Sequence, residues 1–426
     1  MMTPDSHAEL SIDELESCGD LVPLARLLQE GDPEARRHAA RALGGIEDGK
    51  VVEALVSALK DPDCTVRQNA AWGLDRQGWK PTASEASIYY WATKGAWAQC
   101  VKAGRVAVKP LSSILQGCDE ASRSQAALAL GKIGEPAAAA SLITALEDPA
   151  APVRAAAAKA IGMMGDPQGT RALIRALEDP VGSVRKVAVC ALSKLGGGYP
   201  LEVLEGVLRD PNCTVRAAAA EALGAIGNPQ AIPALRGLLC DRDCDVRRKA
   251  AAALDSLHWE PDCGESGAYY WAAKGEWTHC LEGNQASLVP ILAAIQHCGC
   301  TEAEKAVEAR AALLAAKPTE ALISALGDGD RGVRRLAAEL LGEIADPAGV
   351  PVLLEALGDE SGFVRVSAAS ALGKIGDLRA IDALVLALHD RWADVRRAAV
   401  GALERFAAAG ELGEKGRLAL KDLKEE

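Results

Sequence analysis

Apolar residues recur at helical spacing in short stretches, and turns that contain glycine or proline separate these stretches. One stretch begins at Asp210-Pro211, where an acidic cap and a proline in the first turn suit a helix start. It carries an apolar stripe of Val215, Ala219, Ala222, Leu223 and Ile226. Gly227-Asn228-Pro229 ends this helix, and the next apolar stripe consists of Ile232, Leu235, Leu238 and Leu239. The pattern predicts two helices, A and B, joined by a tight turn.

The helix pair repeats along the sequence, and an arginine that follows a valine in helix A marks the copies: Arg67, Arg154, Arg185, Arg216, Arg247, Arg334, Arg365 and Arg396. The numbers of successive members differ by 31 or, twice, by 87. Because 87 exceeds two repeats by 25, each long gap holds one further repeat and a 25-residue insertion. In these further repeats, Arg123 and Ala303 occupy the position of the marked arginine. Arg36 occupies the same position one repeat before Arg67. Such self-similarity is typical of a solenoid. The sequence therefore predicts an all-α solenoid of about eleven helix-pair repeats.

Many unrelated residues share a second, longer offset of 180, which relates Trp79 to Trp259 and Cys100 to Cys280. This offset indicates that a block of about six repeats was duplicated. Leucine, alanine, glutamate and arginine dominate the composition, and no strand pattern is visible. We expect one elongated domain because each solenoid repeat contacts only its neighbours. The expected parts are an N-terminal cap at 1–30, the repeats at 31–408 with insertions at about 79–103 and 259–283, and a polar C-terminal cap at 409–426.

The pattern Asp-Pro-x-x-x-Val-Arg-x-x-Ala-Ala-x-Ala-Leu-Gly-x-Ile-Gly spans residues 210–227, and it recurs closely at 148–165 and 359–376. It resembles the HEAT-like repeats of the phycobilisome lyase type, and the resemblance covers roughly residues 20–408. The resemblance implies stacked helix pairs. It implies several functions, because such repeats occur in scaffolds, bilin lyases, a deoxyhypusine hydroxylase and DNA glycosylases.

An aspartate lies six residues before each marked arginine. A catalytic pair is needed once, whereas this pair recurs in almost every repeat. We therefore predict a structural Asp–Arg ladder along the turns, bidentate where the geometry allows. Its members are Asp61 and Arg67, Asp148 and Arg154, Asp179 and Arg185, Asp210 and Arg216, Asp241 and Arg247, Asp328 and Arg334, Asp359 and Arg365, and Asp390 and Arg396.

The two insertions follow an A helix and are rich in aromatic residues: Trp79, Tyr89, Tyr90, Trp91 and Trp97 in the first, and Trp259, Tyr269, Tyr270, Trp271 and Trp277 in the second. We expect a short helix in each, capped by Ser84 or Glu265 and ended by Gly95 or Gly275. The rings either pack this helix onto the solenoid or form an exposed platform, since Tyr and Trp are favoured interface anchors. Both roles are compatible, and these aromatics are candidates for partner contact.

Histidine and cysteine gather in the second copy, at His258, Cys263, His279, Cys280, His297, Cys298 and Cys300. Thiolates and imidazoles bind zinc. However, no C-x-x-C spacing occurs, and Cys298-Gly299-Cys300 is too close for a usual structural pair. We expect no bound metal and no other cofactor.

Motifs of enzymes are missing from the sequence. The di-iron centre of HEAT-like deoxyhypusine hydroxylases uses His-Glu pairs, and this sequence contains no His-Glu dipeptide. It contains no P-loop, dinucleotide fingerprint or nucleophile elbow. A bilin-lyase-like role, or a role as the partner of a lyase, stays open because it needs a surface rather than a fixed motif. We predict a protein without catalytic residues.

The net charge of −12 argues against a nucleic-acid partner because the long-range field repels phosphate. Three outward arginines of the central B helices, Arg171, Arg175 and Arg209, are nevertheless candidates for partner contact, although Glu178 and Glu202 interrupt them. The N-terminal residues lack the features of a secretory leader, and no apolar run reaches about 18 residues. We therefore expect a cytoplasmic protein that does not cross a membrane.

The outward middle positions of the predicted B helices hold mostly small residues: Ser57, Ser113, Thr144, Arg175, Gly206, Gly237, Ala293, Ser324, Glu355 and Leu386. Small residues either let neighbouring B helices approach each other or leave a shallow groove for a helix or extended segment of a partner. Solenoids commonly use such surfaces to bind proteins. The sequence therefore predicts a non-enzymatic scaffold or adaptor whose partner is another protein.

Overall fold

The computed structural model describes residues 21–46, 48–82, 84–117, 119–196, 201–262, 264–277, 279, 288–297, 303–414, 416–418 and 420. The protein divides into two compact units, unit 1 (Met1–Ile226) and unit 2 (Gly227–Glu426). The described residues form helices joined by short turns, and none of them lies in a strand. The predicted α-solenoid is confirmed.

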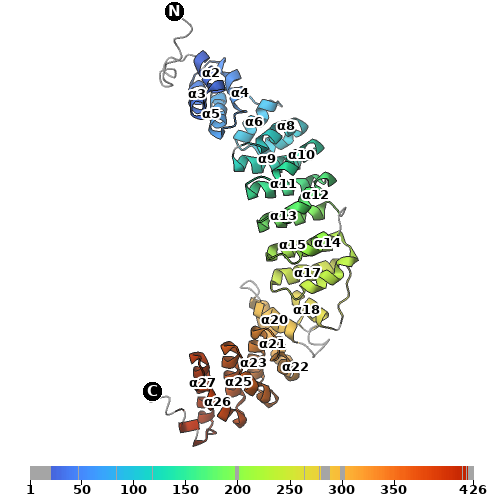
Figure 1. Ribbon diagram of the computed structural model, residues 1–426, viewed down its shortest axis with the longest axis vertical. Coiled ribbons are helices and arrows are strands. Elements are labelled where there is room, and N and C mark those ends of the chain that lie inside the picture. Colours follow the sequence, from blue (N-terminus) through green and yellow to red (C-terminus); the bar gives the residue numbers. More distant parts are fainter. Residues whose placement is uncertain are drawn as a thin grey trace, which may run out of the picture. The chain divides into compact units, whose positions relative to one another are not determined.

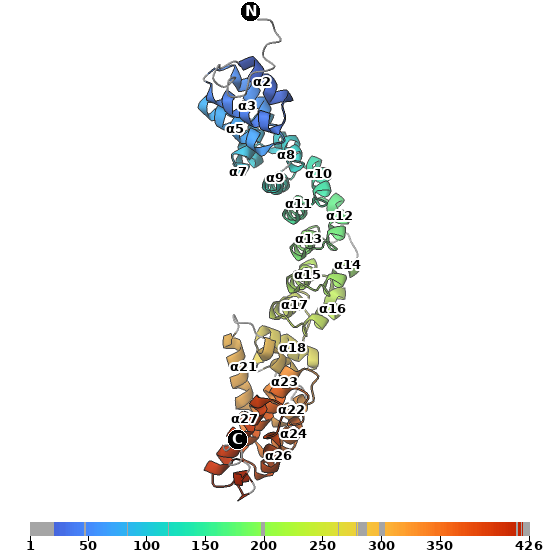
Figure 2. The same ribbon diagram turned by 60° about the vertical axis from the view of Figure 1, so that its left-hand side comes forward.

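Unit 1 consists of helix pairs whose A helices form one row and whose B helices form a second row (Figures 1 and 2). Its A helices are α3 (Pro33–Gly45), α5 (Cys64–Arg76), α9 (Glu120–Ile133), α11 (Ala151–Met164), α13 (Gly182–Lys194) and α15 (Cys213–Ile226). Its B helices are α4 (Val51–Ala58), α8 (Val108–Leu115), α10 (Ala139–Ala145), α12 (Thr170–Ala176) and α14 (Glu202–Val207). The helix α2 (Leu21–Glu30) precedes the first pair, and the first insertion adds α6 (Glu85–Thr93) and α7 (Trp97–Lys102). The 3₁₀ helix η2 (Gly104–Ala107) follows the insertion and leads directly into α8.

Unit 2 repeats this arrangement. Its A helices are α17 (Cys244–Ser256), α21 (Ala303–Ala316), α23 (Arg331–Ile344), α25 (Gly362–Ile375) and α27 (Ala393–Ala408). Its B helices are α16 (Ile232–Leu238), α20 (Val289–His297), α22 (Thr319–Ala325), α24 (Val350–Ala356) and α26 (Ile381–Ala387), and the second insertion adds α18 (Glu265–Lys274). All eleven predicted A helices are therefore present.

The turn from helix A to helix B uses the residues that the sequence pattern singles out. In α11, Gly165 adopts a left-handed conformation with φ 68°, which glycine reaches without steric cost. Asp166 then accepts a hydrogen bond from the backbone N of Gln168 at 2.9 Å. Pro167 starts a single 3₁₀ turn, η4 (Pro167–Gly169), which leads directly into α12. The same 3₁₀ turn precedes α10, α16, α24 and α26 at η3 (Pro136–Ala138), η5 (Pro229–Ala231), η7 (Pro347–Gly349) and η8 (Leu378–Ala380).

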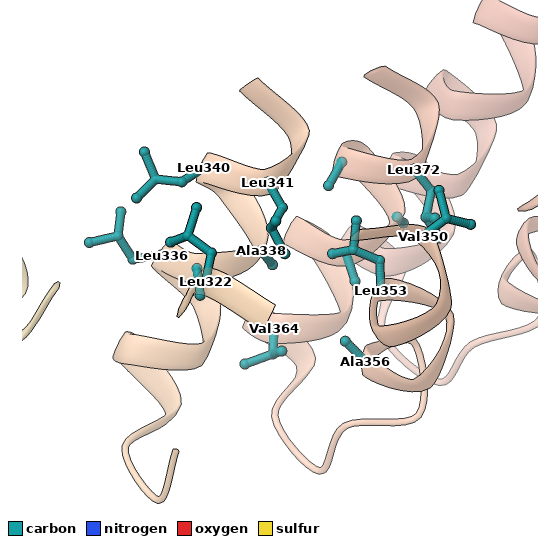
Figure 3. Close-up of a cluster of buried hydrophobic side chains, with 14 of the residues drawn as sticks. Leu322, Leu336, Ala338, Leu340, Leu341, Val350, Leu353, Ala356, Val364 and Leu372 are labelled. Carbon is teal, nitrogen blue, oxygen red and sulfur yellow. The ribbon is translucent and has the colours of Figure 1, made fainter. Parts of the chain in front are cut away.

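The core lies between the two rows of helices. In unit 2, Leu322, Leu341 and Leu353 are completely buried, and they come from α22, α23 and α24. Figure 3 shows these side chains grouped with others from α23 and α25. Full burial of one leucine contributes about 1.5–3 kcal/mol relative to an exposed one. Because each helix buries its stripe against the neighbouring pair, the repeats stabilise one another.

The predicted ladder is present, but its bidentate pairs join neighbouring repeats. Arg154 donates from Nε to Oδ2 of Asp179 at 2.6 Å and from Nη2 to Oδ1 at 2.9 Å. The aspartate that precedes Arg154 by six residues, Asp148, instead accepts through its backbone oxygen, from Nη1 at 2.9 Å. All eight arginines of the predicted ladder make this contact to the backbone oxygen of the aspartate six residues earlier.

The same bidentate pairing to the next repeat holds for Arg36, Arg123, Arg185, Arg334 and Arg365, whose partners are Asp61, Asp148, Asp210, Asp359 and Asp390. Arg67 differs because the first insertion follows its repeat. Its Nη2 donates to Asp119, the residue that caps α9, at 2.9 Å. Asp119 therefore takes the place of the aspartate of the next repeat, and the ladder continues on the other side of the insertion.

The ladder aspartates make the stability depend on pH. Hydrogen bonds from Arg185 and Arg365 hold the pKa values of the ladder residues Asp210 and Asp390 below their usual range. Outside the ladder, a hydrogen bond from Arg37 lowers the pKa of Asp63, the N-cap of α5, to about 2. A carboxyl group with a lowered folded pKa contributes stability above its unfolded pKa of about 3.9. That contribution is lost as the pH falls through the folded pKa. We expect the urea midpoint of unfolding to fall steadily between about pH 4 and pH 2. A midpoint that stays constant over this interval would contradict the role of the ladder.

Candidate protein-binding surfaces

Each insertion is held to the preceding A helix by the same cluster of side chains. In the first, the hydroxyl of Tyr90 donates to Asp75, and Lys94 forms an ion pair with the same carboxylate at 2.8 Å. Trp79 meets the ring of Tyr90 edge-on, with ring centroids 5.3 Å apart. Burial raises the pKa of Tyr90 to about 12, and the hydrogen bond to Asp75 adds to this shift. The tyrosine therefore stays protonated at neutral pH and remains a donor.

The second insertion has the same arrangement at the offset of 180. Tyr270 donates to Asp255, which also forms an ion pair with Lys274 at 3.1 Å. Trp259 packs edge-on against Tyr270 at 5.5 Å. Burial and the bond to Asp255 raise the pKa of Tyr270. These contacts position α18 on α17 and give several of the predicted aromatics a packing role.

The expected caps of the insertion helices are partly wrong. Ser84 is the N-cap residue of α6, but its side chain makes no capping hydrogen bond and contacts Ser87 instead. Gly264, not Glu265, is the N-cap of α18. The backbone N of Gly267 in the first turn donates to Oδ1 of Asp262 at 3.2 Å, so a side chain two residues before the cap supplies the acceptor. Gly95 and Gly275 follow their helices with positive φ values of 71° and 78°, as expected.

The aromatic rings of the insertions are half-buried or buried. Tyr270 and Trp277 are only 4% and 7% exposed. The half-buried ones are Trp79, Tyr89, Tyr90, Trp91, Trp97, Trp259, Tyr269 and Trp271. Tyr89 lines a groove beside α8, and Lys60 lies over its ring at 5.9 Å. Contact of the insertion aromatics with a partner stays a prediction.

Described residues line three grooves on the B-helix side of unit 1. One of about 260 Å³ lies beside α8 and includes Tyr89, Ser113 and Ile114. A second, of about 180 Å³, lies between α10 and α12, and a third, of about 440 Å³, lies between α12 and α14. The last two share Glu178. They combine apolar side chains such as Ile143, Ile174, Val203 and Val207 with charged ones at their edges.

The structure places two of the three candidate arginines at these grooves. Arg175 lines the second groove and pairs with Glu147 at 3.5 Å, where both side chains are largely exposed. Arg209 lines the third groove beside Gly206. Arg171 is exposed but lines none of the three. The outward B-helix positions of the predicted list are exposed, apart from the half-buried Ala293.

The predicted cysteine and histidine cluster lies largely outside the described residues, which exclude Cys263, Cys280, Cys298, Cys300 and the side chain of His297. His279 stacks on Trp271 with ring centroids 4.5 Å apart, and His258 is exposed. In the part of the protein that the structure describes, no three potential metal ligands come together. Cys100 is buried, its Sγ donates to the backbone oxygen of Ile88 at 3.6 Å, and burial raises its pKa to about 11.

Among the described helices, none combines the length and the apolar character that a membrane span requires. A family model of HEAT repeats matches residues 21–87, 108–197, 200–263 and 319–404. This protein belongs to the HEAT-repeat family. The matched segments leave out residues 88–107, which include most of the first insertion. They also leave out residues 264–318, a stretch that starts inside the second insertion and continues beyond it.

Several solved structures are similar to this HEAT-repeat protein. An engineered protein is 23% identical, with 91% of this chain and 98% of the other covered and a TM-score of 0.33. Human deoxyhypusine hydroxylase is 22% identical, with 74% and 99% covered and a TM-score of 0.25. Kap121p is 15% identical, with 93% and 46% covered and a TM-score of 0.37. Among curated proteins, no match is found.

Proposed function

We propose that this HEAT-repeat protein is a non-enzymatic scaffold that binds a segment of another protein along the B-helix grooves of unit 1. The observation that carries the proposal is the pair of adjoining grooves between α10, α12 and α14. Their apolar side chains would take up apolar residues of a partner, and the charged residues at their edges would orient it. Arg175, Arg209 and Glu178 are the edge residues that we assign to this role.

The first insertion extends the same surface. Tyr89 lines the groove beside α8, so we assign it direct contact with the partner. Tyr90, in contrast, uses its hydroxyl to contact Asp75 and serves to hold α6 in place. In the second insertion, Trp259 and Tyr270 have the corresponding packing role. The remaining half-buried rings, including Trp97, stay candidates for contact.

Several finer assignments belong to the same proposal. On the sequence pattern at 210–227, we assign the repeats to the phycobilisome lyase type. We propose a cytoplasmic protein, with residues 1–30 and 409–426 acting as end caps of the repeats. No observation on the described residues favours the alternatives, a bilin-lyase-like role or a deoxyhypusine-hydroxylase-like activity.

A bulky residue placed in the groove tests the proposal. Gly206 on α14 is exposed, and a Cβ at this position would meet no atom within 4 Å. Gly206→Trp should therefore leave the fold intact but fill the groove beside Val207 and Arg209. We expect the affinity for a protein captured from the source organism to fall at least about tenfold, as for loss of an interface anchor. Titration calorimetry with the purified partner measures this change.

The matched control is Gly49→Trp. Gly49 is equally open and exposed, lies in unit 1, and sits in the turn between α3 and α4 away from the three grooves. Its variant should bind like the parent protein. Equal affinities of both variants, or failure to capture any partner, would refute the proposed surface. In the same assay, an unchanged affinity of the Trp97→Ala, Trp277→Ala double variant would leave those two rings with a packing role alone.

A further inference from the structure

A fourth groove lies on the opposite, A-helix side of unit 1, between α3 and α5. It measures about 620 Å³ and is lined by Arg37, His38, Arg41, Thr65, Gln68, Asn69 and Trp72. None of the three B-helix grooves shares a residue with it. It is therefore a separate surface from the one assigned to the scaffold function.

The lining is positive although the protein as a whole has a net charge of −12. Two guanidinium groups, from Arg37 and Arg41, line the groove, and no carboxylate does. Arg37 already forms an ion pair with Asp63 at 2.5 Å, so Arg41 supplies the charge that a ligand would meet, and Glu34 in the first turn of α3 does not line the groove. Arg41 is exposed, so its charge is available to a ligand. The local charge is thus complementary to an acidic ligand.

Trp72 supplies an apolar face in the same groove. Its side chain is 46% exposed, which is unusual for tryptophan in this protein. The guanidinium of Arg76 lies over the ring, 5.1 Å from the centroid. A Cβ added to Gly44 would come within 3.1 Å of the ring, so α3 supports it closely from below. A tryptophan that is closely supported and 46% exposed is typical of interface anchors.

The duplicated block provides an internal comparison. The residues that hold the insertions recur at an offset of 180, as Asp75, Tyr90 and Lys94 match Asp255, Tyr270 and Lys274. The groove residues do not recur. Arg37, Arg41, Trp72 and Arg76 correspond to Ala217, Glu221, Ala252 and Ser256. Because the second copy forms its helices without them, the repeat fold does not require these side chains.

We infer that the groove between α3 and α5 binds a short acidic segment of a partner protein. A carboxylate of the segment contacts Arg41, and an apolar side chain packs on Trp72. The two guanidinium groups of the lining come from α3, and α5 adds polar residues and Trp72. At the matching positions, the next A helix, α9, has Ser124, Gln125 and Leu128. A patch confined to two helices suits a short peptide, whereas a nucleic acid needs a longer basic stripe and is repelled by the net charge.

The test uses the full-length protein and a fluorescein-labelled short peptide of alternating glutamate and leucine, followed by fluorescence anisotropy. We expect saturable binding that weakens with salt. Arg41→Glu and Trp72→Ala should each reduce the affinity at least about tenfold. The matched control is Lys159→Glu, because Lys159 is an exposed lysine at the repeat position of Arg41 on α11. This variant should bind like the parent protein, and circular dichroism checks that every variant folds.

Four results would overturn the inference. They are absence of binding at about 1 mM peptide, equal weakening by Lys159→Glu, equal binding of a peptide with glutamine in place of glutamate, and tighter binding of a labelled single-stranded oligonucleotide than of the peptide. Gly206→Trp should leave peptide binding unchanged, since Gly206 lies at the third B-helix groove. The tests of the B-helix grooves and of the groove between α3 and α5 therefore give independent results.

Discussion

Replacing Arg365 by alanine should lower the free energy of unfolding by about 3–5 kcal/mol, the usual range when one partner of a buried ion pair is removed. Arg365 is only 4% exposed. Its Nε and Nη2 donate to the two carboxylate oxygens of Asp390 at 2.8 and 2.9 Å, and its Nη1 donates to the backbone oxygen of Asp359 at 2.8 Å. Alanine leaves the carboxylate and the carbonyl without these donors. Urea unfolding followed by circular dichroism measures the loss.

The control for this variant is Arg379→Ala. Arg379 also forms an ion pair, with Asp377 at 2.6 Å, but its side chain is 58% exposed. Water can replace the lost partner there, so the change should stay within about 0.5 kcal/mol. Hydrogen exchange should show that Arg365→Ala loosens mainly α25 and α27, because a solenoid repeat contacts only its neighbours. Equal effects of the two variants would mean that the ladder contributes no more than an exposed pair.

The sequence predicted the ladder but not its pairing. The repeat period of 31 shows that an aspartate and an arginine accompany almost every repeat, yet it is equally compatible with pairs inside a repeat and between repeats. The choice depends on the direction of the arginine side chain at the start of helix A. In the structure it contacts the backbone of its own turn and the carboxylate of the next, as Arg185 does with Asp179 and Asp210. The repeat period of the sequence does not contain this direction.

The two gaps of 87 residues predict where the insertions lie, but they do not predict how exposed the aromatic rings are. Ring exposure depends on how closely α6 and α18 pack onto the preceding A helices. The sequence did contain the relevant signal, because Asp75 and Lys94 share the offset of 180 with Asp255 and Lys274. A charged pair that recurs with the tyrosine between its members indicates an internal contact. The opposite signal, a tryptophan without a counterpart, marks Trp72 and its groove.

Glycines inside the A helices provide the last test, because helix propensity and packing predict opposite results for them. Gly373 lies in α25 against α27, and a Cβ there would come within 2.6 Å of both Cα and Cβ of Ala402. Such an overlap with backbone forces the two helices apart. Gly373→Ala should therefore destabilise the protein by about 1–3 kcal/mol, the usual cost of overpacking.

Gly401 lies in the interior of α27, and a Cβ there would meet nothing within 4 Å. Gly401→Ala should raise the free energy of unfolding by up to about 1 kcal/mol, because alanine loses less conformational entropy in a helix. Urea unfolding of both variants under one set of conditions compares the two changes. If Gly373→Ala were also stabilising, the packing of α25 against α27 would tolerate a methyl group at this position. The close approach of the two helices would then not explain the glycine.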